Sequence, residues 1–192
     1  PLLLFLADAT GHGIGPALSV TQARAMLRIA LRYSEDLDDL LRHINAQLTT
    51  DLASDRFITA FLGILDPVQH HVEYHAPGQG PLLHFEAANQ CCHWLNASTV
   101  PLGIMDDPPV DPTPPIHLAP GDLLVLLTDG FYEYQAENQQ QFGREGVGRV
   151  VEQCYHQPAT CIVQQLVTAA RQFAGAAPQL DDLTALIVKR LP

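Results

Sequence analysis

The sequence predicts an α+β fold built around antiparallel sheet. Short apolar runs typical of strands and longer runs with helical spacing occur in clusters, without the strict strand–helix alternation of a parallel sheet. Strand-like runs in the first half are joined by turn signals, as in antiparallel pairs. The chain has 192 residues, of which 47% are hydrophobic, which suffices for a sizeable core in one or two small domains.

The chain is expected to begin with a strand and two helices. Residues 2–7 form a continuous apolar run that ends at a Gly-rich stretch, as a short buried strand would. Helical spacing of apolar residues follows over 16–33 and again over 37–52. Residues 34–36 (Ser-Glu-Asp) indicate the end of the first helix and the start of the second.

An antiparallel meander is expected next. Residues 57–65 are rich in β-branched and aromatic side chains and end at an Asp-Pro turn signal. Two further strand-like runs follow at 71–76 and 81–86, separated by Pro-Gly-Gln-Gly at 77–80. The three runs are therefore interpreted as consecutive antiparallel strands.

The second half is expected to contain a loop, two strands and two helices. Residues 106–120 include six prolines, too many for a helix or a central strand, so they form an extended surface connection. An apolar strand at 122–127 is stopped by Thr-Asp-Gly, helices are expected at 143–153 and 159–174, and a last strand at 183–188.

Charge and composition restrict the partners. Ten Lys and Arg against 21 Asp and Glu give a formal charge of −11, which repels nucleic acid and anionic membranes. The apolar runs are far shorter than the ~20 residues that span a bilayer. Four cysteines and no leader sequence indicate a soluble cytoplasmic protein. Because the chain starts at Pro1 without Met, it is expected to be part of a larger protein.

Acidic residues stand at the ends of three predicted strands. Asp8 follows the first strand, Asp129 follows the strand at 122–127, and Asp181 with Asp182 precedes the last strand. Carboxylates on rigid elements that converge from distant sequence are what Mg²⁺ or Mn²⁺ requires. Taken singly, each Asp is also typical of an ordinary turn, in which its side chain accepts hydrogen bonds from nearby backbone N–H groups.

Six motifs occur in a specific order along the chain. They are DATGHG (8–13), RFITAFLGILD (56–66), PLGI (101–104), LAPGDLLVLLTDGFYE (118–133), FGREG (142–146) and LDDLTALIV (180–188). This ordered set resembles the metal-dependent serine/threonine phosphatase (PPM) superfamily, in its bacterial SpoIIE/RsbU-type branch. The resemblance covers nearly the whole chain, from Leu2 to Arg190.

The resemblance implies a fold and a metal site. The fold would be a four-layer αββα sandwich of two antiparallel sheets flanked by helices, here N-terminally truncated, with residues 1–192 as a single phosphatase domain. The site would hold two Mn²⁺ or Mg²⁺ ions. By position, Asp8 resembles the carboxylate that bridges both ions, the carbonyl of Ala9 a further ligand, and Asp129 and Asp181 ligands of the first ion.

Two neighbouring residues have less direct expected roles. Asp182 resembles a group that orients the site from outside the ligand shell. His12 lies in the DATGHG loop, where it either orients water near the metals or only structures the loop.

The sequence departs from the family pattern in two places. The acidic GGD-type segment that helps hold the second ion would lie before Pro1, so this ion would be under-liganded here. Where relatives read AGH-x-P, this chain has Gln79 in the place of the histidine.

The resemblance also implies a function. The chain would be a phosphoserine/phosphothreonine protein phosphatase in bacterial signalling, stress response included, that acts on an anti-sigma-factor antagonist. It would be the C-terminal output domain of a protein with an upstream receiver, PAS or GAF sensor, and a homodimer is compatible with the resemblance. The alternative is a weak or inactive pseudophosphatase that binds a partner.

Two further side-chain groups have simpler interpretations. Cys91 and Cys92 are adjacent and cannot supply the CxxC spacing of a zinc site, and the histidines near them are expected to be surface or core residues. Arg24, Arg28 and Arg32 lie at helical spacing and form a basic stripe, which is either a solvated face or a dock for an acidic partner.

Overall fold

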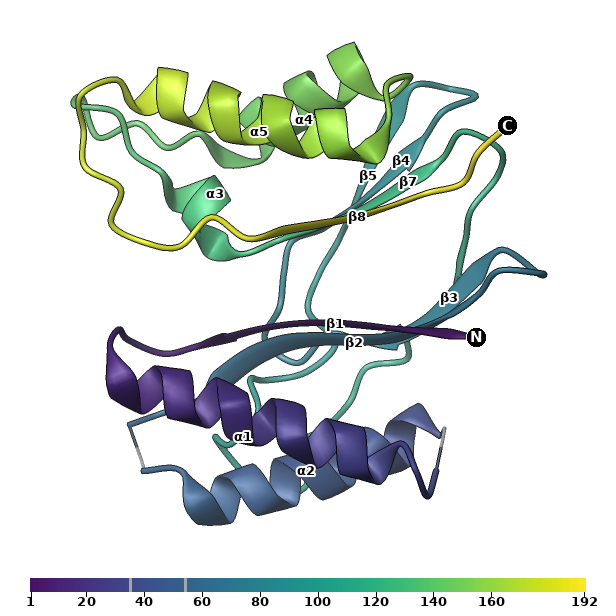
Figure 1. Cartoon of the computed structure of the whole chain (residues 1–192), viewed down its shortest axis with the longest axis vertical. Coiled ribbons are helices and arrows are strands. Elements are labelled where there is room, and N and C mark those ends of the chain that lie inside the picture. The colour runs from purple at the N-terminus through teal and green to yellow at the C-terminus, as the bar shows by residue number, and fades with distance from the viewer. Residues whose placement is uncertain (35, 54) are drawn as a thin grey trace. The chain divides into compact units, whose positions relative to one another are not determined.

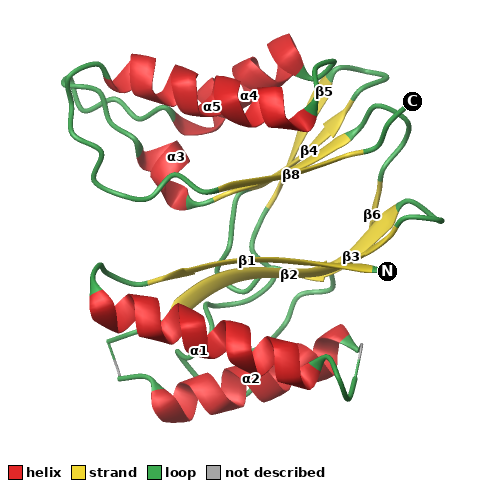
Figure 2. Cartoon of the chain, viewed as in Figure 1, coloured by secondary structure: helices red, strands yellow, loops and turns green. Residues whose placement is uncertain are grey.

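The computed structural model describes residues 1–34, 36–53 and 55–192, and it has the α+β architecture with two antiparallel sheets that the sequence predicts. The chain divides into two units (Figures 1 and 2). Residues 1–79 and 96–116 form the first unit, and residues 80–95 and 117–192 form the second. Each unit consists of one four-stranded sheet with helices packed on one face.

The first unit is built on a sheet with the strand order β1-β2-β3-β6. Its strands are β1 (Leu2–Ala9), β2 (Ile58–Asp66), β3 (His71–His75) and β6 (Ile116–His117). The long β1–β2 pair is antiparallel, as is β2–β3. Helices α1 (Ile14–Ala30) and α2 (Leu37–Asp51) lie side by side on one face of the sheet (Figure 1).

The core of the first unit forms where the apolar faces of α1 and α2 meet the sheet. Leu40, Ile44 and Leu48 recur at every fourth position of α2 and are buried, as an amphipathic helix requires. The cluster also takes in Ala23 and Leu27 from α1. Asp36 caps α2, because its Oδ1 accepts the backbone N–H of Asp39 at 3.0 Å.

The second unit is built on an antiparallel sheet with the order β5-β4-β7-β8. Its strands are β4 (Leu82–Glu86), β5 (Cys91–Leu95), β7 (Leu123–Leu127) and β8 (Ala185–Lys189). Its helices are the short α3 (Asp129–Glu133), α4 (Gly143–Cys154) and α5 (Ala159–Ala174). Helices α4 and α5 cover one face of the sheet (Figure 2).

The core of the second unit joins these two helices to the central strands. Val147 and Val151 of α4 and Ile162 and Leu166 of α5 are fully buried at helical spacing. They belong to one cluster with Phe85 of β4 and with alternate residues of β7. The strand expected at 122–127 is observed as β7 over Leu123–Leu127 and is central in its sheet, as its apolar run indicated.

The predicted meander is correct for two of its three strands. β2 pairs with β3, but β4 pairs with β5 and β7 in the sheet of the second unit. The prolines and glycines at 77–80 do not close a hairpin. They run beside other segments of the first unit, with single bridges from Gly78 to Ala60 and from Pro77 to Thr99, before the chain leaves that sheet.

Three short elements were not expected from the sequence. β5 follows a tight turn after β4, β6 lies within the proline-rich stretch predicted to be only a loop, and α3 begins at the Thr-Asp-Gly stop signal. Each has five residues or fewer, too few to show a period of its own. The expected helix boundary at 34–36 includes Glu35, which lies outside the described residues.

None of the helices in the described ranges combines the length and the apolar character needed to cross a bilayer.

Candidate metal centre

The first unit carries Asp8 near the end of β1. Asp8 pairs with Thr59 of β2, so it belongs to the strand and does not follow it, and Ala9 pairs with Ile58. The next residue, Thr10, donates its backbone N–H (3.0 Å) and its hydroxyl (2.8 Å) to the carbonyl of Phe57 and accepts the N–H of Phe57 at 3.1 Å. These bonds hold the end of β1 against the start of β2.

The loop after β1 turns on two glycines. Gly11 and Gly13 have φ values of +88° and +92°, which side chains other than glycine rarely adopt. They leave His12 exposed in the loop. At the start of α1, the guanidinium of Arg56 lies directly against Gly15, where a Cβ atom would collide with it. Arg56 is a cation at this loop that the sequence reasoning did not single out.

The second unit carries Asp129 and Asp181. Asp129 is the first residue of α3, directly after β7, and Asp181 lies in the segment before β8. Their carboxylate oxygens approach within 4.8 Å of one another. The structure thus brings these two predicted ligands together, although 52 positions separate them in the sequence (181 − 129).

The segment of Asp181 is held against β7 by Thr128. Thr128 is buried, donates its hydroxyl to the carbonyl of Asp182 at 3.0 Å and accepts the N–H of Thr184 at 3.0 Å. Gly130 allows this approach, because a Cβ atom there would collide with the carbonyl oxygen of Asp182. The Thr-Asp-Gly and Asp-Asp-x-Thr motifs are therefore complementary parts of one local structure.

The electrostatics of this pair favour a cation. Partial burial raises the pKa of Asp129 above its usual value, and the negative charge of Asp181 raises that pKa further. Backbone N–H groups of Asp129 and Gly130 oppose this shift. A divalent cation bound to both carboxylates would remove the repulsion. The all-oxygen donor set fits Mg²⁺ or Mn²⁺, which prefer carboxylate ligands.

Asp182 and Gln79 take positions that the sequence reasoning did not define. The backbone of Asp182 holds the segment next to Asp181, because its carbonyl accepts the Thr128 hydroxyl. Gln79, at the place of the family's histidine, is buried in the first unit, where it has an interaction partner.

The Pro-Gly-Asp motif has a structural role that the sequence did not indicate. Asp122 is almost fully buried, and its two oxygens accept the N–H groups of Ala87 and Ala119, each at 2.9 Å. Its Oδ2 also lies 3.3 Å from Nε2 of His84. Asp122 therefore joins the turn after β4 to the start of β7 and is occupied by these contacts. A buried hydrogen-bonding Asp has no periodic signature in sequence.

The PLGI motif likewise has a structural role, because it is hydrogen-bonded to α2. Asn45 of α2 is buried, accepts the N–H of Gly103 at 3.0 Å and donates to the carbonyl of Met105 at 2.9 Å. Gly103 has a φ of +87°, and a Cβ atom there would press on Leu52. The loop after Pro101 is thus fastened to α2 by a single amide side chain.

The fold is that of the PP2C-type phosphatase domains. The SiaA-PP2C domain of Pseudomonas aeruginosa matches 97% of this chain and 75% of its own with a TM-score of 0.84 at 23% identity. The PP2C phosphatase domain of SpoIIE from Bacillus subtilis, solved with a fragment of its regulatory domain, matches 97% of this chain and 54% of its own, with a TM-score of 0.79 at 18% identity.

The sequence comparisons identify the family. The family model described as Stage II sporulation protein E (SpoIIE) matches residues 1–191, so the chain belongs to the SpoIIE family. It is also 26% identical over 133 residues to "Phosphoserine phosphatase RsbU" of Bacillus subtilis (strain 168). That match covers 69% of this chain but only 39% of RsbU.

Proposed function

We propose that this chain is the catalytic domain of a metal-dependent phosphoserine/phosphothreonine protein phosphatase. The observation that carries the proposal is the Asp129–Asp181 carboxylate pair, built by Thr128 and Gly130 in a chain of the SpoIIE family. Two repelling carboxylates cost stability when no ligand is bound, so a scaffold protein has no reason to assemble them.

Each residue of the site has a proposed role. Asp129 and Asp181 hold the first ion, Asp8 bridges both ions, and the carbonyl of Ala9 is a further ligand. Asp182 positions Asp181 through its backbone, and His12 orients water at the loop. The metal pair, when bound, lowers the pKa of a water nucleophile and neutralises the phosphoryl oxygens. Asp8 is included in this proposal because it lies near the end of β1, and the family resemblance gives it the bridging role.

The ligand set of the second ion is proposed to include a further carboxylate from outside residues 1–192. The family resemblance, in which a GGD-type segment supplies this ligand, supports the proposal. The full-length protein is therefore expected to be more active than the 192-residue chain. Mn²⁺ and Mg²⁺ both fit the oxygen donors.

Arg56 is proposed to bind the substrate phosphate. Its guanidinium lies at the loop that follows Asp8, and a guanidinium binds a phosphate with two parallel N–H···O bonds. We expect Arg56→Ala to lower kcat/KM by about 10- to 100-fold, mainly through KM, and Arg56→Lys to restore part of the loss. Arg24→Ala, on the exposed side of α1, is the matched control and should leave both constants unchanged. An equal loss in both alanine variants would contradict a specific role of Arg56.

The biological setting is proposed from the relatives. RsbU is named a phosphoserine phosphatase, so we propose a phosphorylated regulatory protein of the anti-sigma-factor antagonist type as substrate. The proposal places the chain in the cytoplasm, as a homodimeric output domain controlled by an upstream receiver or sensor domain.

A partner-binding pseudophosphatase is the second candidate. Gln79 favours it, because an amide in the place of the family's imidazole cannot exchange a proton near neutral pH. Measurements of turnover and of metal binding in the same sample separate the two candidates.

Hydrolysis of p-nitrophenyl phosphate and of a phosphoserine peptide with added Mn²⁺ tests the proposal. The full-length protein should be active, and the activity should disappear with EDTA and in Asp129→Asn. The control Glu145→Gln removes one exposed charge from α4 and should remain active. Metal binding without turnover on either substrate would favour the pseudophosphatase. Neither binding nor turnover would overturn both the enzyme and the metal centre.

A further inference from the structure

A large groove lies within the first unit, among segments that do not contribute to the proposed metal centre. The start of α2, strand β3 and the proline-rich loop after Pro101 line it, and its volume is about 1060 Å³. Small-molecule pockets measure about 300–1,000 Å³, so this groove has room for a longer ligand.

The groove is strongly acidic. Six of its described lining residues carry carboxylates: Asp36, Asp38, Glu73, Asp106, Asp107 and Asp111. All six are exposed and come from three separate segments, so the negative charge extends along the groove. Arg42 is the only Lys or Arg among the described lining residues, and its guanidinium is already paired with Asp39 at 2.8 Å. The groove therefore attracts cationic groups along its length.

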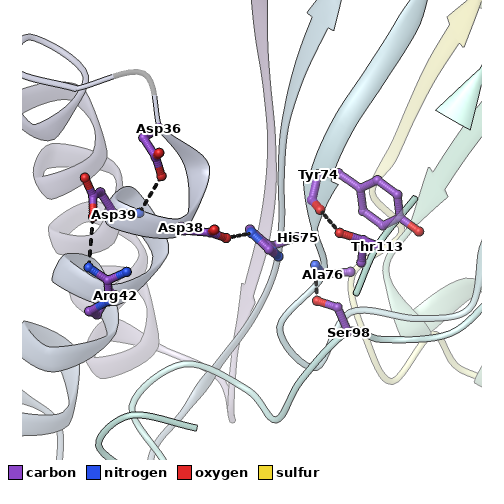
Figure 3. A network of polar contacts seen from close by, with 9 residues as sticks. All are labelled: Asp36, Asp38, Asp39, Arg42, Tyr74, His75, Ala76, Ser98 and Thr113. Carbon is purple, nitrogen blue, oxygen red and sulfur yellow. Dashed lines mark hydrogen bonds and ion pairs between the residues drawn. The ribbon is translucent and has the colours of Figure 1, made fainter. Parts of the chain in front are cut away.

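A histidine with an unmet hydrogen bond lies in the wall of the groove. His75 is only 8% exposed, and its Nε2 lies 2.7 Å from Oδ1 of Asp38, whose side chain is 73% exposed (Figure 3). Since a carboxylate only accepts, Nε2 carries the proton in this contact, and in the neutral imidazole the other ring nitrogen, Nδ1, presents a lone pair. Among the described residues this buried Nδ1 has no hydrogen-bond partner. In this state, an N–H donor of a ligand that reaches Nδ1 would meet this need.

Hydrogen bonds hold the walls of the groove together in the absence of a ligand. Thr113 donates its hydroxyl to the carbonyl of Tyr74, and the hydroxyl of Ser98 accepts the N–H of Ala76 at 2.8 Å, which fastens the loop segments to β3 (Figure 3). Thr99 also donates to the carbonyl of Pro109 at 2.6 Å. A preformed groove loses little conformational entropy on binding.

We infer that this groove docks a basic, extended peptide segment of a partner protein. Lysine or arginine side chains of the segment would lie opposite Asp38 and the carboxylates at 106–111, with one N–H donor directed at His75. The volume of the groove and the spread of its charges over three segments of the chain favour a peptide over a small polyamine. This docking surface is additional to the proposed phosphatase site and does not depend on it.

Fluorescence anisotropy with a labelled octalysine peptide tests the inference on the full-length protein. The variant pair Asp38→Asn/Asp107→Asn should weaken binding by about tenfold. The matched pair Glu137→Gln/Glu145→Gln removes the same charge from the second unit and should change affinity less than about twofold. Equal weakening by both pairs would show general attraction to an acidic protein and overturn the inference. The inference would also be overturned if spermine displaced labelled octalysine at concentrations similar to those at which unlabelled octalysine does.

The ¹⁵N chemical shifts of the His75 ring provide a second readout, independent of affinity. Without peptide, Nδ1 should show the shift of an unprotonated nitrogen without a donor, and octalysine should move it towards that of a hydrogen-bonded acceptor. His84, which lies in the second unit, is the internal control and should not respond. An unchanged His75 signal at saturating peptide would place the peptide elsewhere and contradict the inference.

Discussion

At the scale of single residues, the Asp129 carboxylate is expected to lower the free energy of unfolding of the metal-free chain, although it contributes to the proposed metal site. Its raised pKa reflects partial burial and repulsion by Asp181. Without metal, Asp129→Asn should therefore stabilise the chain, by roughly 0.2–1 kcal/mol because charge pairs this exposed interact weakly. Thermal unfolding in EDTA measures the effect. With saturating Mn²⁺ the unchanged chain should be the more stable of the two, since the variant loses a ligand of the metal.

The same residue predicts a pH dependence. The unfolded chain releases the Asp129 proton at a lower pH than the folded chain does, so the ionised group lowers stability above the unfolded pKa. This penalty disappears as the pH falls through the raised folded value. In EDTA, the melting temperatures of the unchanged chain and of Asp129→Asn should differ at about pH 7 and converge near about pH 3. A gap that stays constant over this range would contradict the assignment.

Asp122 is expected to be important for stability. Asp122→Ala would remove the acceptor of the N–H groups of Ala87 and Ala119, which are only partly buried, so we expect a loss of about 2 kcal/mol in the free energy of unfolding. Urea unfolding measures this loss, with Glu137→Ala on an exposed loop as the control. A loss of less than about 1 kcal/mol would mean that water replaces these bonds.

At the scale of elements, the site depends on how closely the segment before β8 approaches α3. Gly130→Ala would press its Cβ against the carbonyl of Asp182 and displace Asp181 from Asp129. We expect weaker Mn²⁺ binding by calorimetry and a lower melting temperature. Gly148→Ala in α4 is the matched control, because a Cβ there makes only ordinary van der Waals contacts with Cys92 and Trp94 of β5. Unchanged Mn²⁺ affinity in Gly130→Ala would argue against Asp181 as a ligand.

The loop after Pro101 is expected to depend on α2 through Asn45. Asn45→Ala removes both hydrogen bonds to Gly103 and Met105, so we expect a loss of about 2 kcal/mol or more in the free energy of unfolding. Hydrogen exchange should accelerate at Gly103 and at neighbouring loop amides. The exposed neighbour Ala46 offers the control Ala46→Ser, which should leave the loop protected.

At the scale of the whole molecule, the surplus of negative charge opposes the folded state. With a formal charge of −11, much of it on exposed Asp and Glu, self-repulsion should be screened by salt. The melting temperature in EDTA should therefore rise by a few degrees with added KCl. Unchanged melting would mean that the charges are already balanced locally.

Much of the architecture could be predicted from hydrophobic pattern. The long helices α2 and α5 lie where apolar periodicity placed them, because each has enough residues to express a period, and the strands β1, β2 and β7 lie where runs of apolar and β-branched residues indicated them. Short elements such as β5 and α3 have no such signal. The pairing of β4 was predicted wrongly, since a strand's sequence shows which face is apolar but does not identify its neighbour.

By itself, the sequence determined which residue types are available for chemistry and in which family context they occur. Asp8, Asp129 and Asp181 could be named because motifs are local and ordered along the chain. Only the tertiary structure decided that Asp129 faces Asp181 and that Asp122 accepts hydrogen bonds from the backbone. It also decided that Asp38 and His75 share an acidic groove. The physical reason is that partners distant in sequence are chosen by sheet register and side-chain packing, which cooperate across the fold and leave no local pattern.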